Sequence, residues 1–161
     1  MGKMPSIGVN GQYISESLAI VDYLERLQPS PSMVPTDPFA AAKAVELACH
    51  IKLNVELVAR RCLPEALFNT PVSDETKAST EKDLDRGMQA VGQLIVCNPY
   101  AAGDTFSIAD LYTYYSFGLA STIGKKMFNK DILADYPQIA GLMEHLAERP
   151  SIKRVTEEAS A

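Results

Sequence analysis

The segment KMPSIGVNGQYISESLAIVDYLE, residues 3–25, decides how the chain begins to fold. Two short β-prone runs, residues 6–9 and 12–14, flank the dipeptide Asn10-Gly11, which is the pair that a two-residue type I′ hairpin turn prefers. From Glu16 onward apolar residues recur at helical spacing, with charged residues on the other side. The sequence therefore predicts a β-hairpin followed by one amphipathic helix that ends at Gln28.

Beyond that helix, residues 29–37 are rich in Pro and Ser, which predicts an irregular linker. Asp37 followed by Pro38 is typical of the N-cap and the first residue of a helix. The long helix that starts there carries an apolar stripe at alternating spacings of four and three, formed by Ala44, Ala48, Ile51, Val55, Val58 and Cys62. We expect a small unit of residues 1–28, a linker of residues 29–37 and an all-α domain of residues 38–161.

The clearest helix start in the chain lies at residues 106–111. Ser107 and Asp110 have the spacing of a capping box, in which each side chain accepts a hydrogen bond from the other residue's amide. Phe106 before the cap and Leu111 after it have the spacing of a hydrophobic staple. This pattern assigns Asp110 a structural role. Further helices are expected over residues 73–97, 136–148 and 151–158.

The composition excludes several classes of function. The formal net charge is −5, whereas nucleic acids and anionic membranes attract clustered Lys and Arg. No stretch approaches the roughly 20 apolar residues that span a bilayer, and no signal region follows the start, so we expect a cytoplasmic protein. Cys49, Cys62 and Cys97 are odd in number and far apart, which favours reduced thiols. With only two His residues, no metal-ligand cluster is predicted.

Three segments in this order, GKMPSI, ISESLAIVDYLE and FSIAD, resemble the cytosolic glutathione transferase superfamily, from about Gly2 to the C-terminus. In that family a thioredoxin-like domain precedes an all-α domain. GKMPSI is similar to the segment in which a cis-proline opens the third strand, and ISESLAIVDYLE to the fourth strand and third helix. The resemblance implies a mainly α fold, in which the family's C-terminal helical bundle follows a partial thioredoxin-like hairpin plus helix.

The start of the first helix carries the residues of a candidate glutathione site. A helix N-terminus favours an anion, and Glu16 is a poor N-cap, so its carboxylate suits a ligand ammonium. The resemblance implies that Ser17 holds the γ-glutamyl carboxylate and Glu16 the ammonium. It also implies a cis Pro5, with the backbone of Met4 bound to the cysteinyl part and Lys3 near the glycine carboxylate. The alternative is that Glu16 complements the helix dipole and Ser17 caps the helix.

Other candidates lie on the long helix of the α domain, which in the family helps to line the pocket for the electrophile. His50, Arg60 and Arg61 are the candidates, and the alternative is that they face solvent. The aromatic residues between 112 and 117 are better explained as core. In the family a Tyr, Ser or Cys near the end of the first strand activates the thiol. No such segment precedes Lys3, so the catalytic residue is expected upstream of Met1, and this chain alone is not expected to turn over efficiently.

Two functions remain open from the sequence. The first is a transferase that conjugates the glutathione thiol to a small electrophile, with glutathione as co-substrate and no cofactor or metal. The second is a non-catalytic binding or assembly module, because the same fold also serves in protein interaction. The resemblance implies a homodimer in either case, and the broad apolar surface of the long helix is compatible with one.

Overall fold

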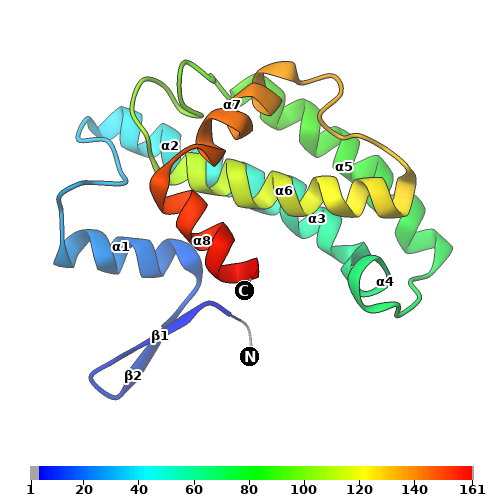
Figure 1. Cartoon of the computed structure of the whole chain (residues 1–161), viewed down its shortest axis with the longest axis horizontal. Helices are drawn as coiled ribbons and strands as arrows, with labels where there is room; N and C mark the ends of the chain where they lie inside the picture. The colour runs from blue at the N-terminus through cyan, green and yellow to red at the C-terminus, as the bar shows by residue number, and fades with distance from the viewer. Residues whose placement is uncertain (1–3, 161) are drawn as a thin grey trace. The chain divides into compact units, whose positions relative to one another are not determined.

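The computed structural model describes residues 4–160 and divides into two compact units, residues 1–33 and 34–161. The division falls inside the segment of residues 29–37 that the sequence predicts as a linker. Each unit has its own secondary structure and is described by itself (Figure 1).

The first unit is a β-hairpin followed by one helix. β1 (Ser6–Val9) pairs antiparallel with β2 (Gln12–Ser15), and α1 (Ser17–Leu27) follows. Asn10 and Gly11 have φ values of 49° and 79°, the two positive values that a type I′ turn needs. The prediction of hairpin plus helix is confirmed, although α1 ends one residue before Gln28. After α1 the chain turns back, because the Glu25 carboxylate accepts hydrogen bonds from the Ser32 hydroxyl (2.6 Å) and the Met33 amide (2.8 Å).

The second unit is entirely helical in its regular structure among the described residues. Its long first helix changes type along its length, turns at its last short segment, and is followed by four further helices (Figure 1). The segments of the long helix are α2 (Pro38–Ile51), the π-helical turn η1 (Lys52–Glu56), α3 (Leu57–Ala59), the 3₁₀ turn η2 (Arg60–Cys62) and α4 (Leu63–Phe68). The others are α5 (Asp74–Leu94), α6 (Ile108–Phe128), α7 (Pro137–Ala147) and α8 (Pro150–Ser160).

Several helix boundaries are set by capping residues that can be recognised in the sequence. Asp37 accepts a hydrogen bond from the Ala40 amide at 2.8 Å, as its position before Pro38 predicts. Ser73 caps α5 in the same way, through the Thr76 amide. α5 ends at Leu94 rather than at Cys97, because Ile95 already has an extended backbone. No helix among residues 4–160 is both long and apolar enough to cross a membrane.

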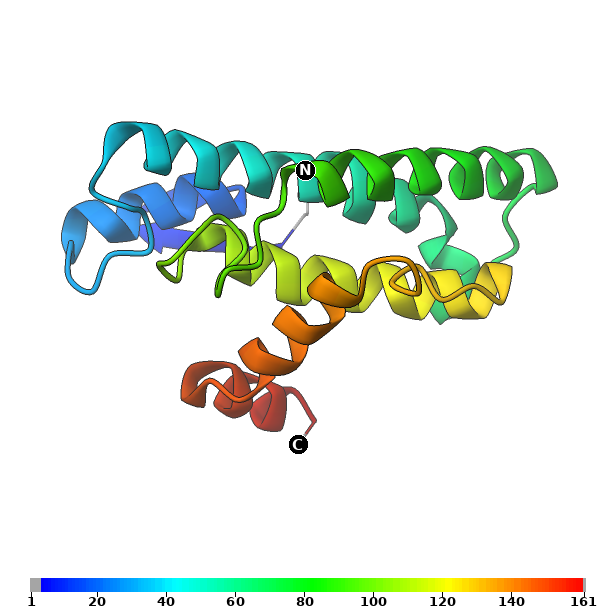
Figure 2. The same ribbon diagram turned by 90° about the horizontal axis from the view of Figure 1, so that it is seen from above.

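The core of the helical unit lies along α6. Figure 2 shows α6 with α2 and α5 on one side and α7 and α8 on the other. The stripe predicted on the long helix is confirmed, since its six residues are at most 7% exposed. On α6 the side chains of Phe117, Ile123 and Thr113 are fully buried. The sequence thus identifies the buried side of the long helix correctly.

Gly87 of α5 lies against the π-helical turn η1 at very short range. A Cβ atom placed on Gly87 would lie 2.0 Å from the carbonyl oxygen of Asn54, which is backbone and cannot swing aside. Gly118 of α6 is the opposite case, because a Cβ there would meet no atom within 4 Å. Of these two glycines, only Gly87 is therefore required by close packing of backbones.

We expect Gly87→Ala to destabilise the protein and Gly118→Ala to leave it unchanged or stabilise it. In a helix Ala is favoured over Gly by up to about 1 kcal/mol, whereas forced overpacking costs about 1–3 kcal/mol. Urea unfolding of the two variants measures the difference. Equal free energies of unfolding for the two variants would show that α5 shifts away from η1 without penalty.

The start of α6 is held by a fully buried carboxylate. Asp110 accepts hydrogen bonds from the amides of Ala101 and Ser107, both at 2.8 Å, and from the Ser107 hydroxyl at 3.3 Å. The capping box predicted from Ser107 and Asp110 is present. Burial raises the pKa of Asp110, and the donated hydrogen bonds act against that rise. The Phe106 ring, before the cap, packs edge-on against Tyr100 with centroids 5.7 Å apart.

Replacement of Asp110 by Ala is expected to lower the free energy of unfolding by about 2 kcal/mol or more, because two buried amides lose their acceptor. Glutathione affinity of the folded protein should not change. Thermal unfolding and calorimetric titration measure the two quantities. Asp104→Ala is the control, since Asp104 is exposed and its carboxylate accepts a hydrogen bond from the hydroxyl of the neighbouring Thr105. Lost affinity at unchanged stability would contradict the structural role.

Candidate functional site

Glu16, between β2 and α1, has a strained backbone conformation. Among the described residues of the first unit, it is the one residue other than Gly with positive φ outside the hairpin turn. Glu16 has φ 72° and ψ 123°, and its side chain makes no capping hydrogen bond to the helix. For a residue other than Gly, such a conformation costs on the order of 1–3 kcal/mol and is found preferentially at functional sites. Its carbonyl oxygen accepts the Ile20 amide at 3.0 Å, so α1 begins directly after it. The exposed Glu16 carboxylate therefore lies at the N-terminus of α1 but does not cap the helix.

The hairpin register brings the remaining candidates of the first unit to the same end. The last pair of the ladder is Ser6 with Ser15, so the adjoining residues, Met4 and Pro5 before one strand and Glu16 and Ser17 after the other, lie at the same end of the hairpin. The Met4–Pro5 peptide bond is cis, as the resemblance implies. Lys3, the remaining candidate, lies outside the described residues.

This end of the hairpin offers two kinds of binding group within one short segment. The first turn of α1 presents backbone amides that have no partner within the helix, together with the positive end of the helix dipole. Such a helix start favours an anion, and the Ser17 hydroxyl stands at its first position. The Glu16 carboxylate beside it favours a cation. A ligand that carries a carboxylate and an ammonium on one carbon matches this pair.

The candidates on the long helix do not lie together. His50 Nδ1 is 3.0 Å from Asn54 Nδ2, and the backbone of Asn54 is the part that Gly87 of α5 approaches. Arg61 donates from Nη1 to Asp83 of α5 at 2.7 Å. His50 and Arg61 are therefore on the side of the long helix that faces α5, and both have partners within the unit.

Arg60 lies on the other side of the long helix, toward α6. Its Nε donates to Glu56 Oε1 at 2.7 Å, and Glu56 Oε2 accepts a hydrogen bond from the Ser116 hydroxyl of α6 at 2.6 Å. The sequence analysis named these residues together, but Arg60 and Arg61 are consecutive, and consecutive side chains of a helix point about 100° apart. The two guanidiniums therefore face different neighbours.

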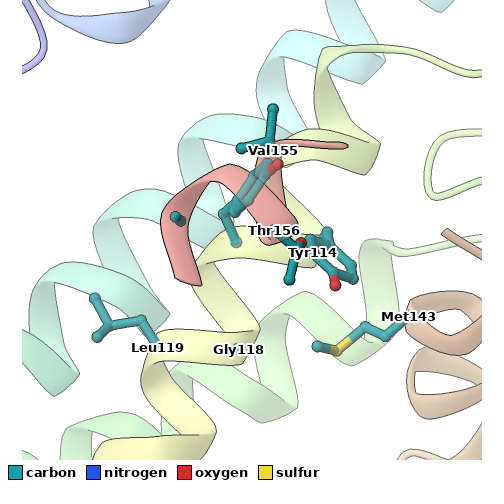
Figure 3. Close-up of a pocket in the computed structure, with 8 residues that line it drawn as sticks. Tyr114, Gly118, Leu119, Met143, Val155 and Thr156 are labelled. Atoms are coloured by element: carbon teal, nitrogen blue, oxygen red, sulfur yellow. The ribbon is translucent and has the colours of Figure 1, made fainter. Parts of the chain in front are cut away.

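A groove of about 410 Å³ lies between α6, α7 and α8, and its lining is mostly apolar (Figure 3). The rings of Tyr114 and Tyr115 meet edge to face there, with centroids 5.2 Å apart, and burial raises the pKa of the Tyr115 phenol. The groove is lined by Tyr114, Tyr115, Gly118, Leu119, Met143, Val155, Thr156 and Ala159.

The groove corrects part of the expectation for the aromatic residues of α6. Tyr112 and Phe117 are core, as predicted, whereas Tyr114 and Tyr115 line the groove. The short amphipathic pattern of residues 151–158 predicts a helix but not where it packs, so the sequence could not reveal this feature.

The described part of the chain groups no metal ligands, and the thiol of Cys97 is not activated. Within residues 4–160 no three His, Cys, Asp or Glu side chains are grouped as metal ligands. Burial, with a smaller contribution from the Asp110 carboxylate, raises the pKa of the Cys97 thiol to about 11. A thiol with such a pKa is not ionised at neutral pH and is a poor nucleophile.

Comparisons with known proteins agree on one family. Residues 64–158 match the family described as glutathione S-transferase, C-terminal domain. A glutathione S-transferase of Pseudomonas putida is 35% identical over 160 residues, which cover 99% of this chain and 73% of that protein. The probable maleylacetoacetate isomerase 1 of Drosophila melanogaster is 28% identical over 155 residues, and the match spans 92% of this chain but only 57% of the fly protein.

Solved structures show the same fold. BphK, a bacterial glutathione transferase solved as a ternary complex, superposes with a TM-score of 0.79 at 22% identity, covering 99% of this chain and 76% of that one. A glutathione transferase homologue from Sulfitobacter, with bound glutathione, gives a TM-score of 0.75 at 20% identity and covers 98% of this chain and 83% of that one.

Proposed function

The chain belongs to the glutathione transferase family, and from this premise we propose that it binds glutathione at the hairpin end and conjugates the thiol to a small electrophile. The observation that carries the proposal is the strained Glu16 at the mouth of α1, beside Ser17. A glutamate that neither caps the helix nor adopts an ordinary backbone conformation is explained by a ligand it must meet.

Each candidate of the first unit has a part in this proposal. Ser17 and the first amides of α1 bind the γ-glutamyl carboxylate, and Glu16 accepts from the ammonium on the same carbon. The backbone of Met4, held by the cis bond to Pro5, pairs with the cysteinyl residue of glutathione in the manner of a neighbouring strand. Lys3 binds the glycine carboxylate.

The conjugation joins the glutathione sulfur to an electrophilic carbon. The thiol first loses its proton, and the sulfur lone pair then forms the new C–S bond while a leaving group departs with the electrons of its own bond. No described side chain of this protein is assigned to thiol activation. We propose that the reaction takes place in the cytoplasm.

Replacing both Glu16 and Ser17 by Ala is expected to weaken glutathione binding at least tenfold, because a hydrogen bond to a charged group contributes about 1.5–3 kcal/mol. Calorimetric titration of the 161-residue chain with glutathione is the measurement. Asp22→Ala is the matched control, since Asp22 is on the same helix and bonds in solvent to Arg26. It should bind as the parent does.

Two results would contradict the proposal. One is that the parent chain does not bind glutathione. The other is that the double variant binds it as well as the control does. A protein complex isolated with this chain and unaffected by the double substitution would instead favour the alternative of a non-catalytic assembly module.

We further propose that the protein is a homodimer formed through the exposed side of the long helix. Val45, Leu53 and Leu57 recur there at multiples of four residues and are 38%, 57% and 42% exposed. Apolar side chains in a row on a helix are typical of a surface that a second subunit covers.

Sedimentation velocity should give a mass of twice 17.5 kDa for the parent and 17.5 kDa for Leu53→Lys, because a charge in an apolar interface is not paired. Val96→Lys is the control, because Val96 is equally exposed, at 55%, but lies in the loop after α5. A monomeric parent, or a dimer insensitive to Leu53→Lys, would contradict this interface.

A further inference from the structure

The groove between α6, α7 and α8 has a glycine, Gly118, where a side chain could stand. A Cβ atom placed on Gly118 would meet no described atom within 4 Å beyond the backbone of its own helix. Glycine inside a helix is less stable than alanine, and here no packing contact requires it. The space that a side chain of α6 would fill is therefore left open to the groove.

The walls of the groove are apolar side chains that the fold leaves partly in solvent. Val155 of α8 is 42% exposed, and among residues 150–159 only the side chain of Ile152 is buried. In the view of Figure 3, Leu119 of α6 and Met143 of α7 lie on either side of Gly118. A ligand in the groove covers apolar surface that α8 leaves uncovered, and the removal of such surface from water is favourable.

The lining of the groove carries no formal charge at neutral pH, since all of its eight residues are apolar or neutral polar. Burial, with a smaller contribution from Tyr114, raises the pKa of the Tyr115 phenol, which keeps this group neutral as well. A carboxylate or an ammonium that enters such a lining loses hydration and gains no opposite charge. The lining therefore favours an uncharged ligand.

Two tyrosines of the lining indicate the chemistry of that ligand. The rings of Tyr114 and Tyr115 meet edge to face, an arrangement that aromatic rings prefer and that a further ring can extend. The thioether of Met143 is another favourable neighbour for an aromatic ring. No described residue forms a hydrogen bond with the hydroxyl of either tyrosine, so each hydroxyl can donate to an acceptor on the ligand.

From these observations we propose that the groove between α6, α7 and α8 binds an uncharged aromatic molecule of one or two rings that carries a hydrogen-bond acceptor. Its volume of about 410 Å³ is in the range of small-molecule sites. All of its lining residues belong to the helical unit, and none is a candidate for the glutathione site. The proposal thus goes beyond the proposed function and does not depend on it.

The test compares 2-acetylnaphthalene with 2-naphthoate, which share a ring system and nearly the same shape but differ in charge. Equilibrium dialysis of the 161-residue chain without glutathione measures both affinities. The parent should bind the ketone at least about tenfold more tightly than the carboxylate, because the carboxylate loses hydration in the groove. Gly118→Leu should weaken ketone binding about tenfold or more, because the leucine side chain occupies the space of the ligand.

Gly141→Leu is the matched control. Gly141 is also a glycine inside a helix, α7, and a Cβ atom there would likewise meet no described atom within 4 Å, but Gly141 does not line the groove. This variant should bind the ketone as the parent does. Circular dichroism checks that the variants are folded. If Gly118→Leu unfolds, Val155→Asp takes its place, since it puts a charge on the wall formed by α8 at an exposed position.

A double variant tests the hydrogen bond to the ligand. Replacing Tyr114 and Tyr115 together by Phe keeps both rings and removes both hydroxyls. It should weaken binding of the ketone about threefold or more, because a neutral hydrogen bond is lost. Unchanged affinity would show that neither hydroxyl binds the acceptor.

The proposal is overturned if the parent does not bind the ketone, if it binds the carboxylate equally well, or if Gly118→Leu binds the ketone as well as Gly141→Leu does. No ketone binding, together with a change of mass in sedimentation velocity for Gly118→Leu, would identify the groove as a protein contact instead. Ketone binding by a chain that does not bind glutathione would support the groove site and contradict only the transferase. Glutathione binding without ketone binding would overturn only the groove site.

Discussion

The helical unit depends on the close contact between α5 and the π-helical turn of the long helix. Gly87 brings the two backbones so near that no side chain fits between them. Because η1 holds an additional residue in its turn, it also sets which side chains of the following turns point toward α5 and which toward α6. Arg60 and Arg61 are consecutive and so point about 100° apart, Arg61 toward Asp83 of α5 and Arg60 toward Glu56, which accepts a hydrogen bond from α6.

Much of the fold could be predicted because its signals are local. The positive φ values of Asn10 and Gly11, the cap at Asp37 and the capping box at Ser107 each depend on residues within four positions of one another. The apolar stripe of the long helix survives the change of helix type, because spacings of four and three tolerate a turn of slightly different length. Features that depend on packing between distant segments, such as the close approach of Gly87 and the groove beside α8, leave no such local signal.

The candidate site was predicted in part for the same reason. The set at the hairpin end lies within residues 3–17, and its described members adjoin the two strand ends that the pairing of Ser6 with Ser15 brings together. By contrast, His50, Arg60 and Arg61 could not all face one ligand, because Arg60 and Arg61 are consecutive. A step of one residue turns a side chain by about 100° around a helix axis, enough to change its neighbours.

Two carboxylates at helix starts, Glu16 and Asp110, show how similar sequence patterns have different physical meanings. Asp110 is fully buried, and its oxygens accept from amides that would otherwise have no partner. Its geometry is explained by the fold itself. Glu16 is exposed, makes no capping bond and lies at a strained backbone position, so its carboxylate does not serve the helix start as that of Asp110 does. Backbone strain of this kind persists only where the surrounding structure holds it, and it is found preferentially at functional sites.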